Sequence, residues 1–222
     1  MIAEEYYQHN NPKISIPKGK TVSFIIQTIQ EVPQYFILAL NNPEIKLPLN
    51  ENKLTQILVE QINALLLEKG VSILAQNQYS DLFYGTRGIP DFYFKKIEKG
   101  KTDKPLYIVE SKILPAPPPN DREKEYVVGE KQNGGIERFK IHKHGKGLND
   151  CGIVGFIKEN NFDYWLKNIN DWISELSKID SFWNEDEKIG LNNKSFDFAY
   201  LHSIAHRKKN KDISLSHFWI KV

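Results

Sequence analysis

Two short apolar stretches that carry charged residues decide the fold: 88–94 (GIPDFYF) and 106–112 (LYIVESK). Both are rich in aromatic and β-branched residues and are bounded by turn-forming residues, a pattern typical of strands. A strand places Glu110 and Lys112, two positions apart, on one face and the intervening serine on the other. Antiparallel pairing of the two strands would bring Asp91 and Glu110 together at one end.

Asp91, Glu110 and Lys112 form the constellation with the clearest chemistry. Two converging carboxylates supply the oxygen ligands that Mg²⁺ prefers, and a nearby lysine can hold or deprotonate an attacking water. Unpaired charges inside an apolar core are costly, so their presence in apolar strands favours a functional site. The alternative is that the strand ends protrude and the three residues form solvated ion pairs, because Glu-x-Lys triplets are common.

The clearest helix is predicted at about 51–69, upstream of these strands. Asn50 suits the N-cap, Gly70 ends the pattern, and apolar residues recur at helical spacing: Leu54, Ile57, Leu58, Ile62, Leu65 and Leu66. Glu51 shares the inward face at the N-terminal end, where a carboxylate can also simply compensate the helix dipole. The two strands favour a role for Glu51 in the site.

The elements around the constellation follow in a simple order. The pattern predicts a helix, three strands, a short helix and a further strand, at 51–69, 71–75, 89–94, 106–114, 136–143 and 151–157. A proline-rich, charged loop begins at Pro115 and separates the third strand from the short helix.

With this order of elements, the residues Glu51, Pro90-Asp91 and Glu110-Ser111-Lys112 resemble the PD-(D/E)XK nuclease superfamily, over roughly 50–158. The resemblance implies an α/β restriction-endonuclease-like core with a mixed sheet. It also implies that Asp91 and Glu110 bind Mg²⁺ or Mn²⁺, and that Lys112 positions or activates water and stabilises charge on the phosphate. Glu51 would support the metal site from the first helix.

The rest of the chain is expected to elaborate this core. Residues 1–48 are interpreted as an N-terminal β extension, either a hairpin or a strand followed by a helical turn, because 22–29 and 35–40 look strand-like. Residues 49–222 are interpreted as the nuclease-like domain. Its C-terminal elaboration, 159–222, is predicted to hold an amphipathic helix and a closing hairpin, at 162–177, 198–206 and 213–222.

The resulting hypothesis is a metal-dependent DNA endonuclease, of a restriction or phage-defence type. The alternatives are a non-catalytic nucleic-acid- or partner-binding protein that retains the fold, and a DNA repair or recombination nuclease. A homodimer is a reasonable expectation for cutting both strands. Weak candidates for contacts to DNA are Arg87, Gln132, Arg138, Lys140, His142 and Lys143.

Composition narrows the class of protein without indicating a partner. The chain has 222 residues, of which 40% are hydrophobic, and a formal net charge of +2. The single cysteine, Cys151, excludes an internal disulfide framework, and no stretch is long and apolar enough to span a membrane. The N-terminus lacks the pattern of a secretion signal, so a cytosolic protein is expected. The pairs His202/His206 and His142/His144 are interpreted as structural or surface histidines.

Overall fold

A computed structural model describes residues 16, 19–118, 120–207 and 211–222 of the chain. The helices are α1 Thr21–Glu31, α2 Pro33–Leu40, α3 Glu51–Glu68, α4 Gly135–Lys140 and α5 Phe162–Ile179, with 3₁₀ turns η1 Asn120–Tyr126 and η2 Glu185–Glu187. The strands are β1 Ile73–Asn77, β2 Phe92–Lys96, β3 Tyr107–Leu114, β4 Asp150–Ile157, β5 Gly190–Lys194, β6 Phe198–Ala205 and β7 Ile213–Lys221. None of the helices in these residues is long and apolar enough to cross a membrane.

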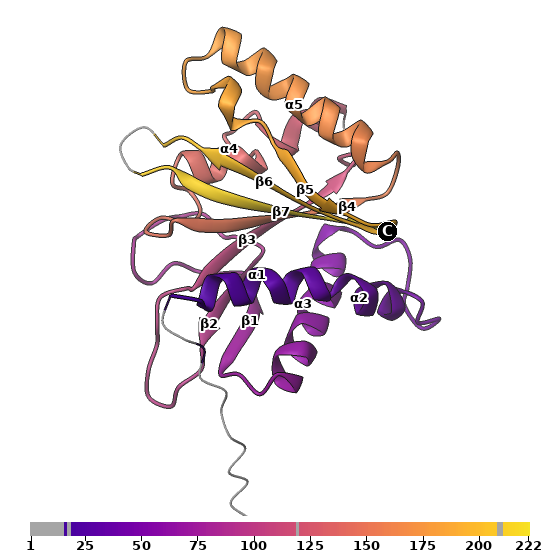
Figure 1. Cartoon of the computed structure of the whole chain (residues 1–222), viewed down its shortest axis with the longest axis vertical. Helices are drawn as coiled ribbons and strands as arrows, with labels where there is room; N and C mark the ends of the chain where they lie inside the picture. The colour runs from indigo at the N-terminus through magenta and orange to yellow at the C-terminus, as the bar shows by residue number, and fades with distance from the viewer. Residues whose placement is uncertain (1–15, 17–18, 119, 208–210) are drawn as a thin grey trace, which may run out of the picture.

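Within the described part of the chain, seven strands form one mixed sheet in the order β1-β2-β3-β4-β7-β6-β5 (Figure 1). Strands β1, β2 and β3 are antiparallel neighbours, whereas β3, β4 and β7 run parallel. The pairs β7–β6 and β6–β5 are antiparallel again. The expected α/β class with a mixed sheet is therefore confirmed.

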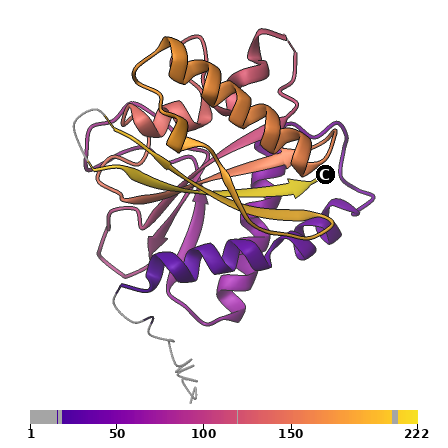
Figure 2. The same cartoon turned by 45° about the horizontal axis from the view of Figure 1, so that its top comes forward.

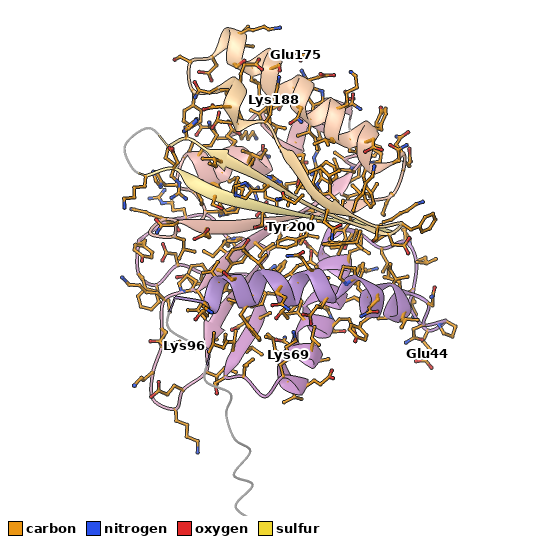
Figure 3. The ribbon with its side chains drawn as sticks, viewed as in Figure 1. Glu44, Lys69, Lys96, Glu175, Lys188 and Tyr200 are labelled. Carbon is orange, nitrogen blue, oxygen red and sulfur yellow. The ribbon has the colours of Figure 1, made fainter. Side chains whose placement is uncertain are left out.

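Helices cover both faces of the sheet and so produce three layers. Helices α1, α2 and α3 lie on one face, and α4 and α5 on the other (Figures 1 and 2). Because side chains alternate along a strand, β4 contributes Val154 to the core under α3, together with Leu58, and Ile153 to the core under α5, together with Ile169. Charged side chains such as Glu175 lie on the outer surface of these helices (Figure 3).

Helix α3 confirms the helix expected at about 51–69. The Asn50 side chain accepts a hydrogen bond from the backbone N–H of Lys53 at 3.0 Å, which satisfies one of the first N–H groups of the helix. At the other end Gly70 has a φ of 64°, the left-handed conformation that ends many helices. The buried stripe of α3 packs against β1 and β3, and this packing places Glu51 beside β3.

The N-terminal β extension expected in 1–48 is wrong where the structure describes it. Residues 21–40 form α1 and α2, while 1–15 and 17–18 lie outside the described residues. Thr28 and Pro33 are buried here together with the large apolar residues Ile25, Ile29, Val32 and Phe36. The large apolar residues recur every three or four positions, which is the spacing of a helix. This spacing outweighs the β propensity of the branched residues, because a helix buries all these large apolar side chains in one stripe against α3.

The C-terminal helix and hairpin are present as α5, β6 and β7, but they are not appended to a finished core. Strand β7 pairs in parallel with β4 along its length, so 159–222 continues the same sheet. Strand β5 is absent from the sequence-based prediction. All five of its residues are exposed, and its sequence, GLNNK, has no apolar alternation that could reveal a strand.

The boundaries of several elements differ from the expectation, and β1 covers Ile73–Asn77 instead of 71–75. Strand β2 begins at Phe92, after Pro90 and Asp91, because proline has no N–H to give to a ladder. Helix α4 ends at Lys140 instead of 143, and His142 has a φ of 59°, which no α-helix accommodates. The loop after β3 contains the 3₁₀ turn η1.

Candidate active site

Asp91 stands immediately before β2, beside β3. Its Oδ2 atom accepts a hydrogen bond from the backbone N–H of Ser111 at 2.6 Å, which links the start of β2 to the centre of β3. Phe92 pairs with Val109 in the antiparallel ladder, so the residues flanking this pair, Asp91 and Glu110, are neighbours across the two strands. The structure therefore brings these two carboxyl groups together.

Lys112 lies on the same face of β3 as Glu110 and contacts it directly. Its Nζ atom donates to Glu110 Oε1 at 2.9 Å and to the Ser111 carbonyl at 2.9 Å. The Glu110 side chain is fully buried and the Lys112 side chain is 7% exposed. The serine between them points to the opposite face, where Thr55 of α3 donates to its hydroxyl at 2.9 Å. The alternation expected along this strand is present.

Glu51 reaches the same cluster from the first turn of α3. Its Oε2 atom accepts a hydrogen bond from the backbone N–H of Ile113 at 3.1 Å, and its Oε1 atom lies 3.6 Å from Lys112 Nζ. The Glu51 side chain is 27% exposed, so this part of the cluster borders solvent. Three carboxyl groups, from α3, β3 and the residue before β2, thus surround one buried ammonium group.

Arg138 and His144 complete the cluster from α4 and the loop that follows it. Arg138 Nη1 forms an ion pair with Glu110 Oε1. His144 is buried, with Nε2 3.1 Å from Glu110 Oε2 and Nδ1 3.0 Å from the Lys143 carbonyl. That carbonyl can only accept, so Nδ1 carries a proton. The sequence-based interpretation of His144 as a surface or merely structural histidine missed its place beside Glu110.

Opposite shifts in pKa separate the two strand carboxyl groups. Burial alone would raise the pKa of Glu110, but Lys112, His144 and Arg138 outweigh it and lower the pKa to about 2. Burial and the neighbouring Glu110 charge raise the pKa of Asp91 to about 8, against the attraction of Lys112. At neutral pH and without a cation, Glu110 is therefore ionised and Asp91 is largely protonated.

The donor atoms suit a hard cation that keeps much of its own water. Among the described residues, no group of three or more His, Cys, Asp and Glu side chains is arranged to hold a metal ion unaided. Glu110 Oε2 is buried and faces His144 Nε2 at 3.1 Å but accepts no well-aligned hydrogen bond, so it is the oxygen of this carboxylate that a cation could use in place of that histidine contact. Mg²⁺ commonly binds one or two carboxylates and completes its shell with water and substrate oxygens. Asp91 and Glu110 fit that kind of site.

The raised pKa of Asp91 leads to an expected effect on stability. The stabilising contribution of its bound proton is complete below the ordinary pKa of 3.8 and is lost as pH rises towards 8. An asparagine at this position cannot ionise but can still accept the Ser111 hydrogen bond. In the absence of metal, we therefore expect Asp91→Asn to melt several degrees above the wild type at pH 9 and much closer to the wild type at pH 5. For a chain of this length, ~1 kcal/mol of unfolding free energy corresponds to about 2–4 °C in melting temperature.

The measurement is thermal unfolding of both proteins across this pH range in EDTA. Asp103→Asn is the matched control, because Asp103 is exposed and lies away from the cluster in the loop before β3. A melting difference between Asp91→Asn and wild type that stays constant from pH 5 to 9 would contradict a protonated Asp91.

The weak candidates for DNA contacts are scattered. Lys140 is fully buried and forms an ion pair with Glu187, so its ammonium group does not lie on the surface of the folded chain. Arg87 and Gln132 are exposed, and the Gln132 carbonyl accepts a hydrogen bond from Lys143 Nζ at 3.4 Å. His142 lines a separate pocket.

The other histidines and the cysteine belong to local structure. His202 Nε2 lies 2.9 Å from Ser214 Oγ, whereas His206 contacts Asp186 and Asp212, so these two histidines do not converge on one site. Burial raises the pKa of Cys151 to about 12, which keeps it a neutral, packed thiol.

Comparison with protein-family models, with curated proteins and with solved structures finds no match to this chain. Over the residues that the structure describes, the chain is therefore an α/β protein with a seven-stranded mixed sheet. Any more specific assignment depends on the chemistry of the cluster around Glu110.

Proposed function

We propose that this protein is a nuclease that uses Mg²⁺ or Mn²⁺ to hydrolyse phosphodiester bonds in DNA. The observation that carries the proposal is the convergence of Asp91, Glu110 and Lys112 at the junction of β2 and β3. Burying an ammonium group among carboxyl groups costs folding free energy. Such a cluster, with one carboxyl group protonated and another ionised, is therefore typical of a functional site. The resemblance of these residues to the PD-(D/E)XK superfamily supports the same assignment.

Asp91 and Glu110 would hold the cation through their carboxylate oxygens. A bound Mg²⁺ ion polarises a phosphoryl oxygen and lowers the pKa of a bound water molecule. Because the cation favours the ionised form of its ligands, Asp91 would lose its proton on binding, and affinity for the metal would rise with pH up to about 8.

Lys112 is suited to stabilise negative charge and not to accept a proton. Glu110, Glu51 and Asp91 raise its pKa above the ordinary value despite its burial, so it remains a cation throughout the neutral range. Glu51 and Glu110 contact the ammonium group from two sides and hold it in place. A fixed ammonium group of this kind stabilises the charge that develops on a phosphate in the transition state.

A pocket of about 590 Å³ borders the cluster and offers room for a substrate. Its lining includes Asn50 and Ile113, the sequence neighbours of Glu51 and Lys112, together with Lys53 and Lys158. The two lysines bring positive charge to the rim, which the carboxylate of Glu159 in the same lining offsets in part. A nucleic acid strand could approach along this rim with its phosphates facing the lysines.

Supercoiled plasmid provides the direct test. We expect conversion to nicked and linear forms with Mg²⁺, no conversion in EDTA, and no conversion by Asp91→Ala, because that variant lacks one proposed metal ligand. Discrete products would support a sequence-specific, restriction-type enzyme, and a smear would support a non-specific defence or repair nuclease. Cleavage by Asp91→Ala at the wild-type rate would remove Asp91 from the mechanism.

One observation favours a second candidate, a nucleic-acid-binding protein that retains the fold without catalysis. Glu110 already contacts three basic side chains, Lys112, Arg138 and His144, so its charge is compensated without a metal. The two candidates differ in their response to Mg²⁺ or Mn²⁺. A nuclease is stabilised against heat by the cation through Asp91, whereas a protein with a purely ionic cluster is not.

A further inference from the structure

The loop between α4 and β4 forms one wall of a second pocket, which lies apart from the cluster around Glu110. Its volume is about 350 Å³, and we call it the basic pocket. The lining residues that carry its character are Tyr84, His142, Lys146, Asn149, Arg207 and Lys211. No acidic side chain is among the described residues that line it.

Arg207 lines the basic pocket and is itself buried. Its guanidinium group donates to three backbone carbonyls, of Phe139 at 2.9 Å, Leu148 at 3.1 Å and Gly145 at 3.1 Å. These bonds satisfy hydrogen-bond donors but supply no negative charge, and no carboxylate in the described part of the chain forms an ion pair with Arg207. A buried cation with neutral partners attracts an anion.

The wall of the pocket adds further positive charge at fixed positions. Lys146 Nζ donates to the Tyr84 carbonyl at 3.1 Å, and Tyr84 packs so closely on Gly147 that a Cβ atom there would lie 2.4 Å from its ring. Burial, then the positive charges of Arg207 and Lys146, lower the pKa of His142. Arg207 and Lys146 therefore both act on the His142 ring, and an anion bound beside that ring would be attracted by both cations.

We propose that the basic pocket binds a phosphate group of a nucleic acid strand, through Lys146, Lys211 and Arg207. This deepens the proposed nuclease function and rests on it for the identity of the polymer. The link is the loop itself, because His144 contacts Glu110 and Gly145, the next residue, is bonded to Arg207. A strand held at the basic pocket would thus be held beside the proposed active site.

Several cations without a carboxylate among them match a polyanion with closely spaced charges, which describes a phosphodiester backbone. Asn149 adds an amide that can donate to a phosphate oxygen. Lys104, whose Nζ atom lies 4.9 Å from the centre of the Tyr84 ring, extends the positive surface beyond the pocket. An acidic peptide is the competing anion that an experiment must distinguish.

The test is binding of a short fluorescent DNA duplex, followed by anisotropy in EDTA so that no cleavage occurs. We expect Lys146→Gln/Lys211→Gln to weaken DNA binding by about 10-fold. The slope of the logarithm of the binding constant against the logarithm of the salt concentration should also fall, by roughly the amount that one phosphate contact contributes. The matched control is Lys96→Gln/Lys178→Gln, which removes the same charge from two exposed lysines elsewhere. Lys96, labelled in Figure 3, is the last residue of β2, at the far end of the strand from Asp91. The control should change affinity by less than about 2-fold.

An equal loss of affinity for DNA in the pocket variant and in the control would overturn the proposal, because it would reflect the change in net charge alone. Polyglutamate that competes as well as DNA, and loses its effect in the pocket variant, would overturn the assignment to phosphate. Because binding is measured without metal, these outcomes are independent of cleavage. If the wild-type protein does not cleave plasmid but the pocket variant still loses affinity for DNA, the nuclease function is refuted and the phosphate-binding site is supported.

Discussion

Replacing Lys112 with alanine should lower the rate of Mg²⁺-dependent plasmid cleavage by about 100- to 1000-fold, the usual cost of losing one group that stabilises transition-state charge. The ammonium group is buried, held by Glu110 and Glu51, and kept protonated by its neighbours. The variant should still fold, because Arg138 and His144 continue to face the Glu110 carboxylate. Initial rates of plasmid nicking, at saturating Mg²⁺, measure the effect.

Lys95→Ala is the matched control, because Lys95 lies on the neighbouring strand β2 with its ammonium group 5.8 Å from the Tyr93 ring and outside the cluster. It should cleave at close to the wild-type rate. Lys112→Arg separates charge from shape: the longer, planar guanidinium keeps the charge but not the position, so partial activity is expected. Wild-type rates for Lys112→Ala, in protein shown to be folded, would exclude the proposed role.

The second large effect concerns stability. Lys140→Met should lower the free energy of unfolding by about 3–5 kcal/mol, because it leaves the buried Glu187 without its cation. Both side chains are almost completely buried, and Lys140 Nζ also lies 4.5 Å from the Trp183 ring centre and 4.6 Å from that of Phe182. The backbone N–H groups of His206 and Asn184 still donate to Glu187 but cannot neutralise it. Urea unfolding measures the loss.

Two variants make this result interpretable. Lys140→Met/Glu187→Leu removes both charges and should recover much of the stability, since an apolar pair of similar volume often replaces a buried ion pair at little cost. Lys167→Met breaks the exposed pair with Asp171 and should cost less than about 1 kcal/mol. A small effect of Lys140→Met would contradict a stabilising role for the buried ion pair between Lys140 and Glu187.

The features that could be predicted from the sequence are those that depend on the periodic spacing of residues close together in the chain. The helical stripe of α3, the alternation along β3 and the capping by Asn50 are each contained within a few neighbouring residues. Asp91, Glu110 and Lys112 lie on or beside two strands that are consecutive in the chain and joined by the loop 97–106, so simple antiparallel pairing brings them together. The place of Glu51 follows because the face of a helix is fixed by its apolar stripe.

The features that could not be predicted depend on contacts between distant segments. Helix α4 has six residues, too few for a reliable pattern, and it sends Arg138 to Glu110 but Lys140 to Glu187. Positions two apart on a helix face different directions, and nothing local decides which one meets the site. His144 depends for its position on an irregular loop held by Arg207, 62 residues after Gly145. No short-range signal carries that information.

Strand β7 has an unusual consequence for any shortened form of the protein. It lies between β4 and β6, so it is an interior strand of the sheet although it is the last element described. A fragment ending before Ile213 would leave two eight-residue strands, β4 and β6, each with an unpaired edge. Open edges of this length recruit strands from other molecules, so such a fragment would tend to aggregate.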